Sequence, residues 1–106
     1  MPTKERNGDT AIRLKGKENL LCGEITSNEI ISTIFNSLGN KLLDNKEIIL
    51  NFIEVKFISV YFLERLEEFV KRAKDLKVQV SITNVNPSIY KVFQVGRIKS
   101  ILEACC

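Results

Sequence analysis

The chain has 106 residues, of which 44% are hydrophobic and 27% charged, and this composition is sufficient for one globular domain with a single core. Its 16 basic and 13 acidic side chains are interspersed and leave a net charge of only +3, which argues against nucleic-acid binding. No stretch approaches the ~20 apolar residues of a membrane-spanning helix, and the N-terminus lacks the apolar core of a signal peptide, so we expect a cytoplasmic protein with no membrane segment.

The first 25 residues predict a polar arm followed by two short apolar segments. Residues 1–10 carry many charges and no periodicity, and we expect them to form a flexible arm ahead of a single domain over residues 11–106. Residues 10–14, TAIRL, predict the first strand. Gly16 then turns the chain into a second segment over residues 19–22.

A helix is predicted after the sequence TSNE. Thr26 fits the N-cap of a capping box, in which its side chain accepts a hydrogen bond from the amide three residues on, while Glu29 reaches back to the Thr26 amide. Gly39 is expected to end the helix by taking the left-handed conformation. The helical spacing of the apolar residues predicts a buried face formed by Ile30, Ile31, Ile34, Phe35 and Leu38.

Residues 47–66 predict a buried strand that leads into a second helix. Residues 47–53, EIILNFI, form a nearly continuous apolar run, which is typical of a central strand or of one covered on both faces. Residues 54–59 predict the connection, and Ser59 is well placed to cap the helix that follows. The predicted buried face of this helix comprises Phe62, Leu63, Leu66, Phe69, Val70 and Ala73.

A further strand and helix are predicted in the last third of the chain. Residues 77–83 alternate between apolar and polar side chains, as a strand with unequal faces does. Asn86 is the expected cap of a third helix, with Pro87 at its first position and Gly96 at its end. Its inward side chains should be Ile89, Val92, Phe93 and Val95, and residues 98–102 predict a last short helical or irregular segment.

This alternation of strands and helices predicts an α/β fold for a single small domain. We expect a mixed or mainly parallel sheet of four to five strands, with the helices packed largely on one face. Because successive parallel strands end on the same side of a sheet, the residues that follow 53 and those that follow 83 should lie on one surface.

The side chains that usually carry catalysis or bind metals are scarce. There is no histidine, so the commonest general base and the usual partner of a serine or cysteine nucleophile are missing. The three cysteines are Cys22, Cys105 and Cys106; they form no CxxC pair and are expected to be reduced thiols. We therefore predict no metal site, no cofactor and no enzymatic activity.

The segments EIILNFI, EVKFIS, VYFLERLEEFVKRAK, VQVSITNV and PSIYKVFQVG together resemble the STAS domain, the fold of anti-sigma factor antagonists. The resemblance covers about residues 25–103. It implies a regulatory module that acts by binding a protein, such as a histidine-kinase-like ATPase or an anti-sigma factor. In that family the connection after the central strand commonly reads Asp-Ser-Ser-Gly or Asp-Ser-Thr-Gly, and one of its hydroxyls is phosphorylated by the partner.

This chain departs from that motif. Aligning FISVYFL with it puts Ser59 in the aspartate place, Val60 in the first serine place, Tyr61 in the phosphoacceptor place and Phe62 in the glycine place. The resemblance therefore supports the fold and a docking surface better than a serine switch. Ser59 is first of all an N-cap, and Ser59 and Tyr61 are the two hydroxyls here that a kinase could phosphorylate.

We expect a protein partner to dock at the strand-to-helix junction, with Glu54 and Lys56 flanking the contact. Asn84 and Asn86 are explained as turn and cap residues, and Ser88 as an exposed residue, but they should border the same surface. The alternative is a regulatory domain that binds a nucleotide or another anion at the same helix N-terminus. The predicted docking residues are Ser59, Val60, Tyr61, Phe62, Asn84, Asn86 and Ser88.

Overall fold

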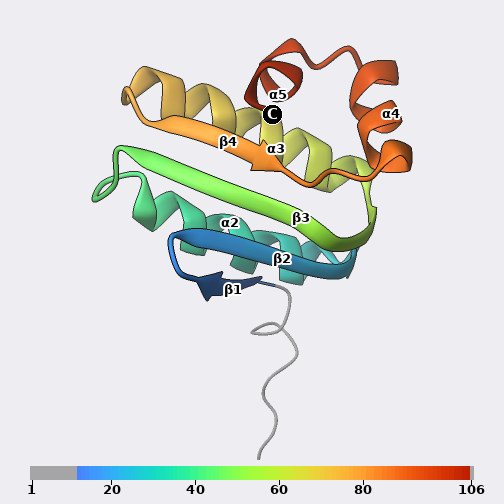
Figure 1. The fold of residues 1–106 in the computed structure, drawn as a ribbon, viewed down its shortest axis with the longest axis horizontal. Helices are drawn as coiled ribbons and strands as arrows, with labels where there is room; N and C mark the ends of the chain where they lie inside the picture. The colour runs from blue at the N-terminus through green and yellow to red at the C-terminus, as the bar shows by residue number, and fades with distance from the viewer. Residues whose placement is uncertain (1–11, 106) are drawn as a thin grey trace, which may run out of the picture.

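A computed structural model of the chain describes residues 12–105 (Figure 1). The predicted arm over residues 1–10 lies outside the described residues. The described part is one four-stranded sheet with strand order β1-β2-β3-β4. The strands are β1 (Ile12–Lys15), β2 (Glu18–Ile25), β3 (Glu47–Ile58) and β4 (Gln79–Thr83).

The sheet is mixed, as the sequence predicts. The strands β1 and β2 form an antiparallel hairpin, and Gly16 at its turn has a φ of 62°, a conformation that glycine adopts without strain. The strand β2 is parallel to β3, and β3 is parallel to β4. Two parallel pairs and one antiparallel pair agree with the predicted mainly parallel sheet.

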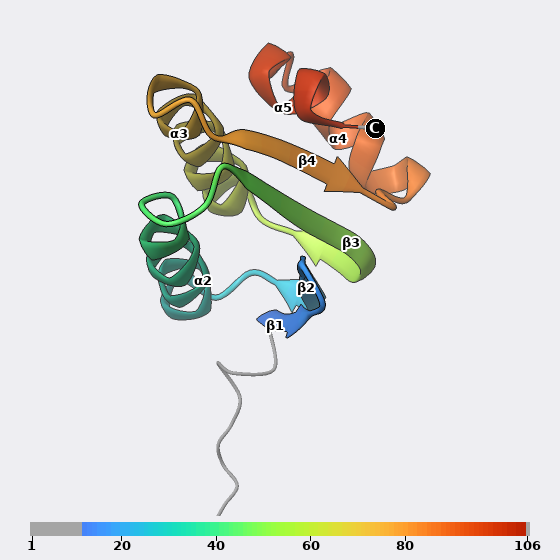
Figure 2. The same ribbon diagram turned by 60° about the vertical axis from the view of Figure 1, so that its left-hand side comes forward.

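The two longest helices cover one face of the sheet. They are α2 (Asn28–Lys41) and α3 (Val60–Asp75), which lie side by side behind the strands in Figure 1 and to one side of them in Figure 2. The shorter α4 (Pro87–Val95) and α5 (Lys99–Ala104) lie beyond the β4 edge (Figures 1 and 2). The prediction of helices largely on one face is thus correct for α2 and α3.

The core lies between these helices and the sheet. The predicted inner face of α3 is confirmed, because all six of its residues are buried and Phe62 is 0% exposed. These residues are Phe62, Leu63, Leu66, Phe69, Val70 and Ala73. Phenylalanine rings join the layers: the Phe62 ring lies 5.4 Å from Phe35 on α2 and 6.1 Å from Phe52 on β3, between ring centres. A further ring pair, Phe52 with Phe93 at 6.3 Å, connects β3 to α4.

Both predicted ends of α2 are wrong. The N-cap is Ser27 and not Thr26, because the Ser27 hydroxyl accepts a hydrogen bond from the Ile30 amide at 3.4 Å. Gly39 keeps a helical conformation inside α2, which runs on to Lys41. Leu42 follows at 4% exposure, so the extra turn places another leucine in the core.

The strand β3 is longer than predicted and leaves almost no connection. It continues to Ile58, because β2 stays paired with it through two shifts of register, up to Ile25 opposite Ile58. Val55 and Ile58 are buried in this half, whereas the residues between them are exposed. Residues 54–58 therefore belong to the strand, and Ser59 alone separates β3 from α3.

The inner face of α4 is narrower than predicted. Ile89 and Phe93 are buried as expected, but Val92 is 41% exposed and Val95 is 73% exposed. The reason is the position of α4 beyond the β4 edge, where one side of the helix can reach the core (Figure 2). Val92 and Val95 lie to the side of that contact and face a groove.

Candidate functional site

The junction between β3 and α3 is held by hydrogen bonds of Ser59. The Ser59 side chain accepts from the Phe62 amide at 3.2 Å, so the predicted N-cap is confirmed. The Ser59 amide donates to the carbonyl oxygen of Ile25 at 3.2 Å, which ties the junction to the end of β2. These two hydrogen bonds therefore hold the start of α3 firmly against the end of the sheet.

Val60 and Phe62 point to opposite environments. Val60 is 71% exposed at the first position of α3. Phe62 is fully buried between the rings of Phe35 and Phe52. The structure thus places Val60 on the predicted docking surface and Phe62 beneath it, where its side chain supports the junction without being open to a partner.

Tyr61 lies half-buried between α2 and α3. Its hydroxyl accepts a hydrogen bond from Nη1 of Arg65 at 3.0 Å, and the Arg65 guanidinium lies 5.8 Å from the centre of the Tyr61 ring. Two side-chain hydrogen bonds lower the pKa of Tyr61 below its ordinary value of 10.0, and the bond with Ser32 has a larger effect than the bond with Arg65. Tyr61 therefore borders the junction on the side of α2.

The two asparagines after β4 bind to β3. The Asn84 side chain donates to Oδ1 of Asn51 at 3.1 Å, and Asn84 itself has a φ of 57°. Asn86 accepts from the Ile89 amide at 2.9 Å, which confirms it as the cap of α4, and its Nδ2 donates to the Val55 carbonyl at 3.2 Å. The Asn86 bond brings the start of α4 beside the second half of β3, whereas the Asn84 bond lies at Asn51, in the first half of that strand.

Ser88, Glu54 and Lys56 are all exposed. Ser88 lies in the first turn of α4 and lines a groove that also includes Val60. Glu54 pairs with Arg13 of β1, with 3.7 Å between Oε2 and Nη2. The pair turns Glu54 toward β1, so Lys56 is the predicted flanking residue whose charge stays unpaired among the described residues.

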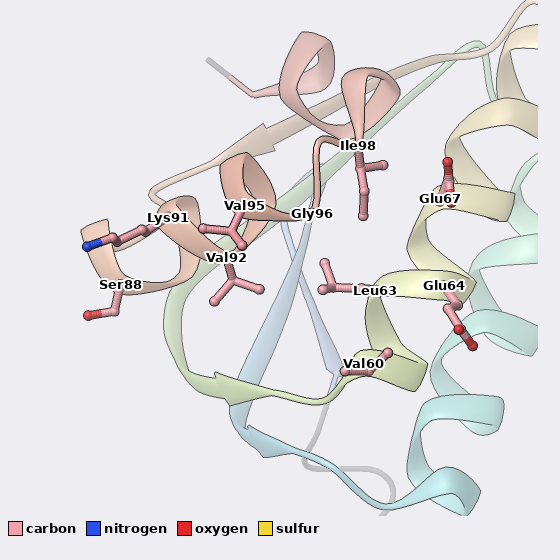
Figure 3. A pocket seen from close by; sticks show the side chains of 10 residues that line it. All are labelled: Val60, Leu63, Glu64, Glu67, Ser88, Lys91, Val92, Val95, Gly96 and Ile98. Atoms are coloured by element: carbon pink, nitrogen blue, oxygen red, sulfur yellow. The ribbon is translucent and has the colours of Figure 1, made fainter.

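The largest hollow near the junction is an apolar groove between α3 and α4, with a volume of about 550 Å³ (Figure 3). Leu63 on α3 and Val92 on α4 point toward one another across it (Figure 3). Ile98, in the link from α4 to α5, closes one end. The groove is lined by Val60, Leu63, Glu64, Glu67, Ser88, Lys91, Val92, Val95, Gly96 and Ile98.

Sequence reasoning missed most of this groove. It assigned Val92 and Val95 to the core because their helical spacing from Ile89 fits a broad apolar face. The spacing alone could not show that α4 lies beyond the sheet edge.

Within residues 12–105, no three or more side chains of the metal-binding types gather in one place. In the same part of the chain, no helix has both the length and the apolar character needed to cross a bilayer.

A comparison with models of protein families matches residues 3–104 to the STAS domain. The chain belongs to the STAS domain family. The match extends over nearly the whole chain, and it confirms the resemblance drawn from the strand and helix pattern. A comparison with curated proteins found no match.

Solved structures similar to this STAS domain include the anti-sigma factor antagonist SpoIIAA. Its unphosphorylated form has a TM-score of 0.64 and 19% identity, with 80% of this chain and 81% of that chain covered. The phosphorylated form of the Bacillus cell fate determinant SpoIIAA has a TM-score of 0.68 and 16% identity, covering 90% and 86%. The STAS domain of a SulP transporter from Vibrio cholerae has a TM-score of 0.60 and 13% identity, covering 88% and 75%. At these identities the similarity shows a shared fold.

The two N-caps of the STAS domain should differ in their contribution to stability. Ser59→Ala removes one capping bond and is expected to lower the free energy of unfolding by about 1 kcal/mol. Asn86→Ala removes a cap and also the bond to the Val55 carbonyl, so a loss of about 2 kcal/mol is expected. Urea unfolding followed by circular dichroism measures both. Ser88→Ala, at an exposed site, is the control, and equal losses for the two caps would contradict the second role of Asn86.

The pKa of Tyr61 should rise toward 10.0 when Ser32→Ala or Arg65→Gln removes a hydrogen-bond partner of its hydroxyl. Tyrosinate absorbance measured in a Tyr90→Phe background, which leaves Tyr61 as the only tyrosine, follows the titration. Because the folded pKa is lowered, the contribution to stability is complete above the pKa of the unfolded chain and is lost as the pH falls through the folded value. An unchanged titration in both variants would show that neither bond exists in solution.

Proposed function

We propose that this STAS domain is a non-catalytic regulatory module of the cytoplasm that binds a protein partner at the β3–α3 junction. The docking surface consists of the exposed and half-buried residues at this end of the sheet, namely Ser59, Val60, Tyr61, Asn84, Asn86 and Ser88. Phe62 supports it from the core. The observation that carries the proposal is the exposed apolar surface of Val60 and the adjoining groove, on a junction that is fixed by hydrogen bonds.

The proposed partner is a histidine-kinase-like ATPase or an anti-sigma factor. This proposal rests on the STAS family match together with the similarity to SpoIIAA, which is described as an anti-sigma factor antagonist. A partner of this kind would meet a surface unlike one built on a glycine-containing turn. The glycine place is taken by Phe62, which lies in the core, and the two hydroxyl places are taken by the bulkier Val60 and Tyr61.

Ser59 and Tyr61 are the proposed phosphoacceptors on this surface. A phosphate on Ser59 would lie at the N-terminus of α3, where backbone amides and the helix dipole stabilise negative charge. A phosphate on Tyr61 would lie beside the Arg65 guanidinium, which already donates to its hydroxyl. Mass spectrometry of the protein purified from its own host tests this proposal, and unmodified Ser59 and Tyr61 under every growth condition would contradict it.

The alternative of a nucleotide or anion site at the start of α3 is less well supported. The Ser59 hydroxyl already occupies the Phe62 amide, so one of the donors that would meet a phosphate is taken. Isothermal titration with a panel of nucleotides separates the two functions. Saturable binding that Ser59→Asp abolishes would favour the alternative.

The docking surface is tested by Tyr61→Asp, which places a charge on its edge. We expect a loss of affinity of at least about tenfold, or about 1.4 kcal/mol, for the host's histidine-kinase-like ATPases. Each ATPase is purified and its binding is measured by surface plasmon resonance. Tyr90→Asp, at a half-exposed tyrosine outside the surface, is the matched control. Unchanged affinity of Tyr61→Asp with an intact circular dichroism spectrum would contradict the proposed surface.

A further inference from the structure

The groove between α3 and α4 has two walls of the same length and spacing. On α3 it is lined by residues 60, 63, 64 and 67, and on α4 by residues 88, 91, 92 and 95. Each set follows the spacing i, i+3, i+4, i+7, so each wall is one face of a helix two turns long, or about 10 Å. Such a groove offers room for a third helix that packs against both walls.

The floor of the groove and much of both walls are apolar. Leu63 is buried at its base, while Val60, Val92 and Val95 keep 71%, 41% and 73% of their surfaces exposed. Valine side chains gathered around one concavity are an unfavourable surface to leave in water. Covering them would bury apolar area without any change in the fold.

The two walls carry opposite charge. Glu64 and Glu67 line the α3 side, and Lys91 lines the α4 side. Glu67 is paired with Lys71 at 3.2 Å. Among residues 12–105, Glu64 and Lys91 take part in no ion pair, so one free acid and one free base stand on opposite edges of the groove.

We infer that this groove binds an amphipathic helix of a protein partner. About two turns of that helix would lie in the groove, with apolar side chains at the spacing i, i+3 or i+4, and i+7. Arginine or lysine on one flank would meet Glu64, and an acidic residue on the other flank would meet Lys91. The inference rests on the proposed function, because the groove continues into the docking surface through Val60 and Ser88, and it adds the form and charge of the bound segment.

A helix suits this site better than a second copy of the chain does. The site is concave, and two copies related by a two-fold axis through it would place one hollow against the other. A helix is convex and fills the hollow along its length. Its flanks would also satisfy both free charges at once, since the acid and the base stand on opposite walls.

The test uses a labelled 18-residue peptide designed as an amphipathic helix, with leucines on one face, arginines on one flank and glutamates on the other. Its binding to the full chain is followed by fluorescence anisotropy. We expect saturable binding that Val95→Asp weakens at least about tenfold. Leu43→Asp is the matched control, because Leu43 is 74% exposed and lies outside the groove, and it should leave the affinity unchanged.

A second pair of variants tests the charge. Glu64→Lys should weaken the binding of a peptide with arginines on both flanks several-fold, whereas Glu24→Lys, an exposed control on β2, should have no effect. Equal affinity of the wild-type chain for the mixed-flank peptide and for peptides with two basic or two acidic flanks would overturn the charge assignment.

Three results would overturn the inference as a whole. They are no binding of the peptide, binding that Val95→Asp does not weaken, and a dimer in sedimentation equilibrium that Val95→Asp dissociates, which would assign the groove to a second copy. Each is separate from a failure of the proposed function. If the ATPase binds and Tyr61→Asp weakens it while the peptide does not bind, the form of the bound segment is wrong and the docking surface stands.

Discussion

Replacing Phe62 by alanine is expected to lower the free energy of unfolding by about 3–5 kcal/mol. The ring is fully buried and lies within 5.4 and 6.1 Å of the rings of Phe35 and Phe52, measured between centres. Its removal leaves a cavity where α2, β3 and α3 meet, and the two neighbouring rings, fixed on α2 and β3, can close it only in part. Urea unfolding monitored by far-UV circular dichroism measures the loss.

Val60→Ala is the control for this prediction, since the side chain is two residues away and 71% exposed. It should change the free energy of unfolding by less than about 0.5 kcal/mol. A loss of the same size in both variants would mean that the first turn of α3 is packed differently from the structure. A small loss for Phe62→Ala alone would mean that the core can collapse around the missing ring.

Phe62 also shows which kind of sequence argument is reliable in this chain. Its helical spacing with Leu66 and Phe69 predicted burial, and the structure confirms it. Its alignment with the glycine place of the STAS motif predicted a surface position instead. The spacing of apolar residues reflects what the core requires of this chain, whereas the motif reflects what relatives place at that point, and here the two disagree.

The sheet and most of its partners could be predicted from local patterns. The strand residues from Glu47, the caps Ser59 and Asn86, and the buried face of α3 follow from apolar spacing and from capping chemistry, which act over a few residues. The ends of elements could not be predicted in the same way. Gly39 stays helical because Leu42 has a place in the core one turn later, and that place exists only once the sheet has formed.

The groove is a further feature that depends on tertiary structure. Val92 and Val95 look like core residues as long as α4 is assumed to lie on the face of the sheet. They become surface residues because α4 lies beyond β4, where the sheet ends (Figure 2). The candidate site therefore combines a predicted part, the capped junction, with an unpredicted part, the apolar wall of α4.

A polar cluster within the sheet connects the end of β4 to β2 and β3. Asn51 stands in the apolar run of β3 and is only 8% exposed. Its Nδ2 donates to Oε1 of Glu18 at 2.7 Å, and its Oδ1 accepts from the Ile53 amide at 2.9 Å and from Nδ2 of Asn84 at 3.1 Å. One side chain thus joins β2, β3 and the end of β4.

Replacing Asn51 by leucine is expected to lower the free energy of unfolding by about 2–4 kcal/mol, because the Ile53 amide and the Asn84 side chain lose their acceptor and the Glu18 carboxylate loses a donor. Urea unfolding measures the loss, and Asn36→Leu on the exposed side of α2 is the matched control.

Native-state hydrogen exchange should become faster at the Ile53 amide. In a double-mutant cycle, Asn84→Ala should cost less in the Asn51→Leu background than in the wild type, because their shared bond is already gone. Additive losses would contradict the cluster and would separate the end of β4, where the docking surface begins, from the strand beside it.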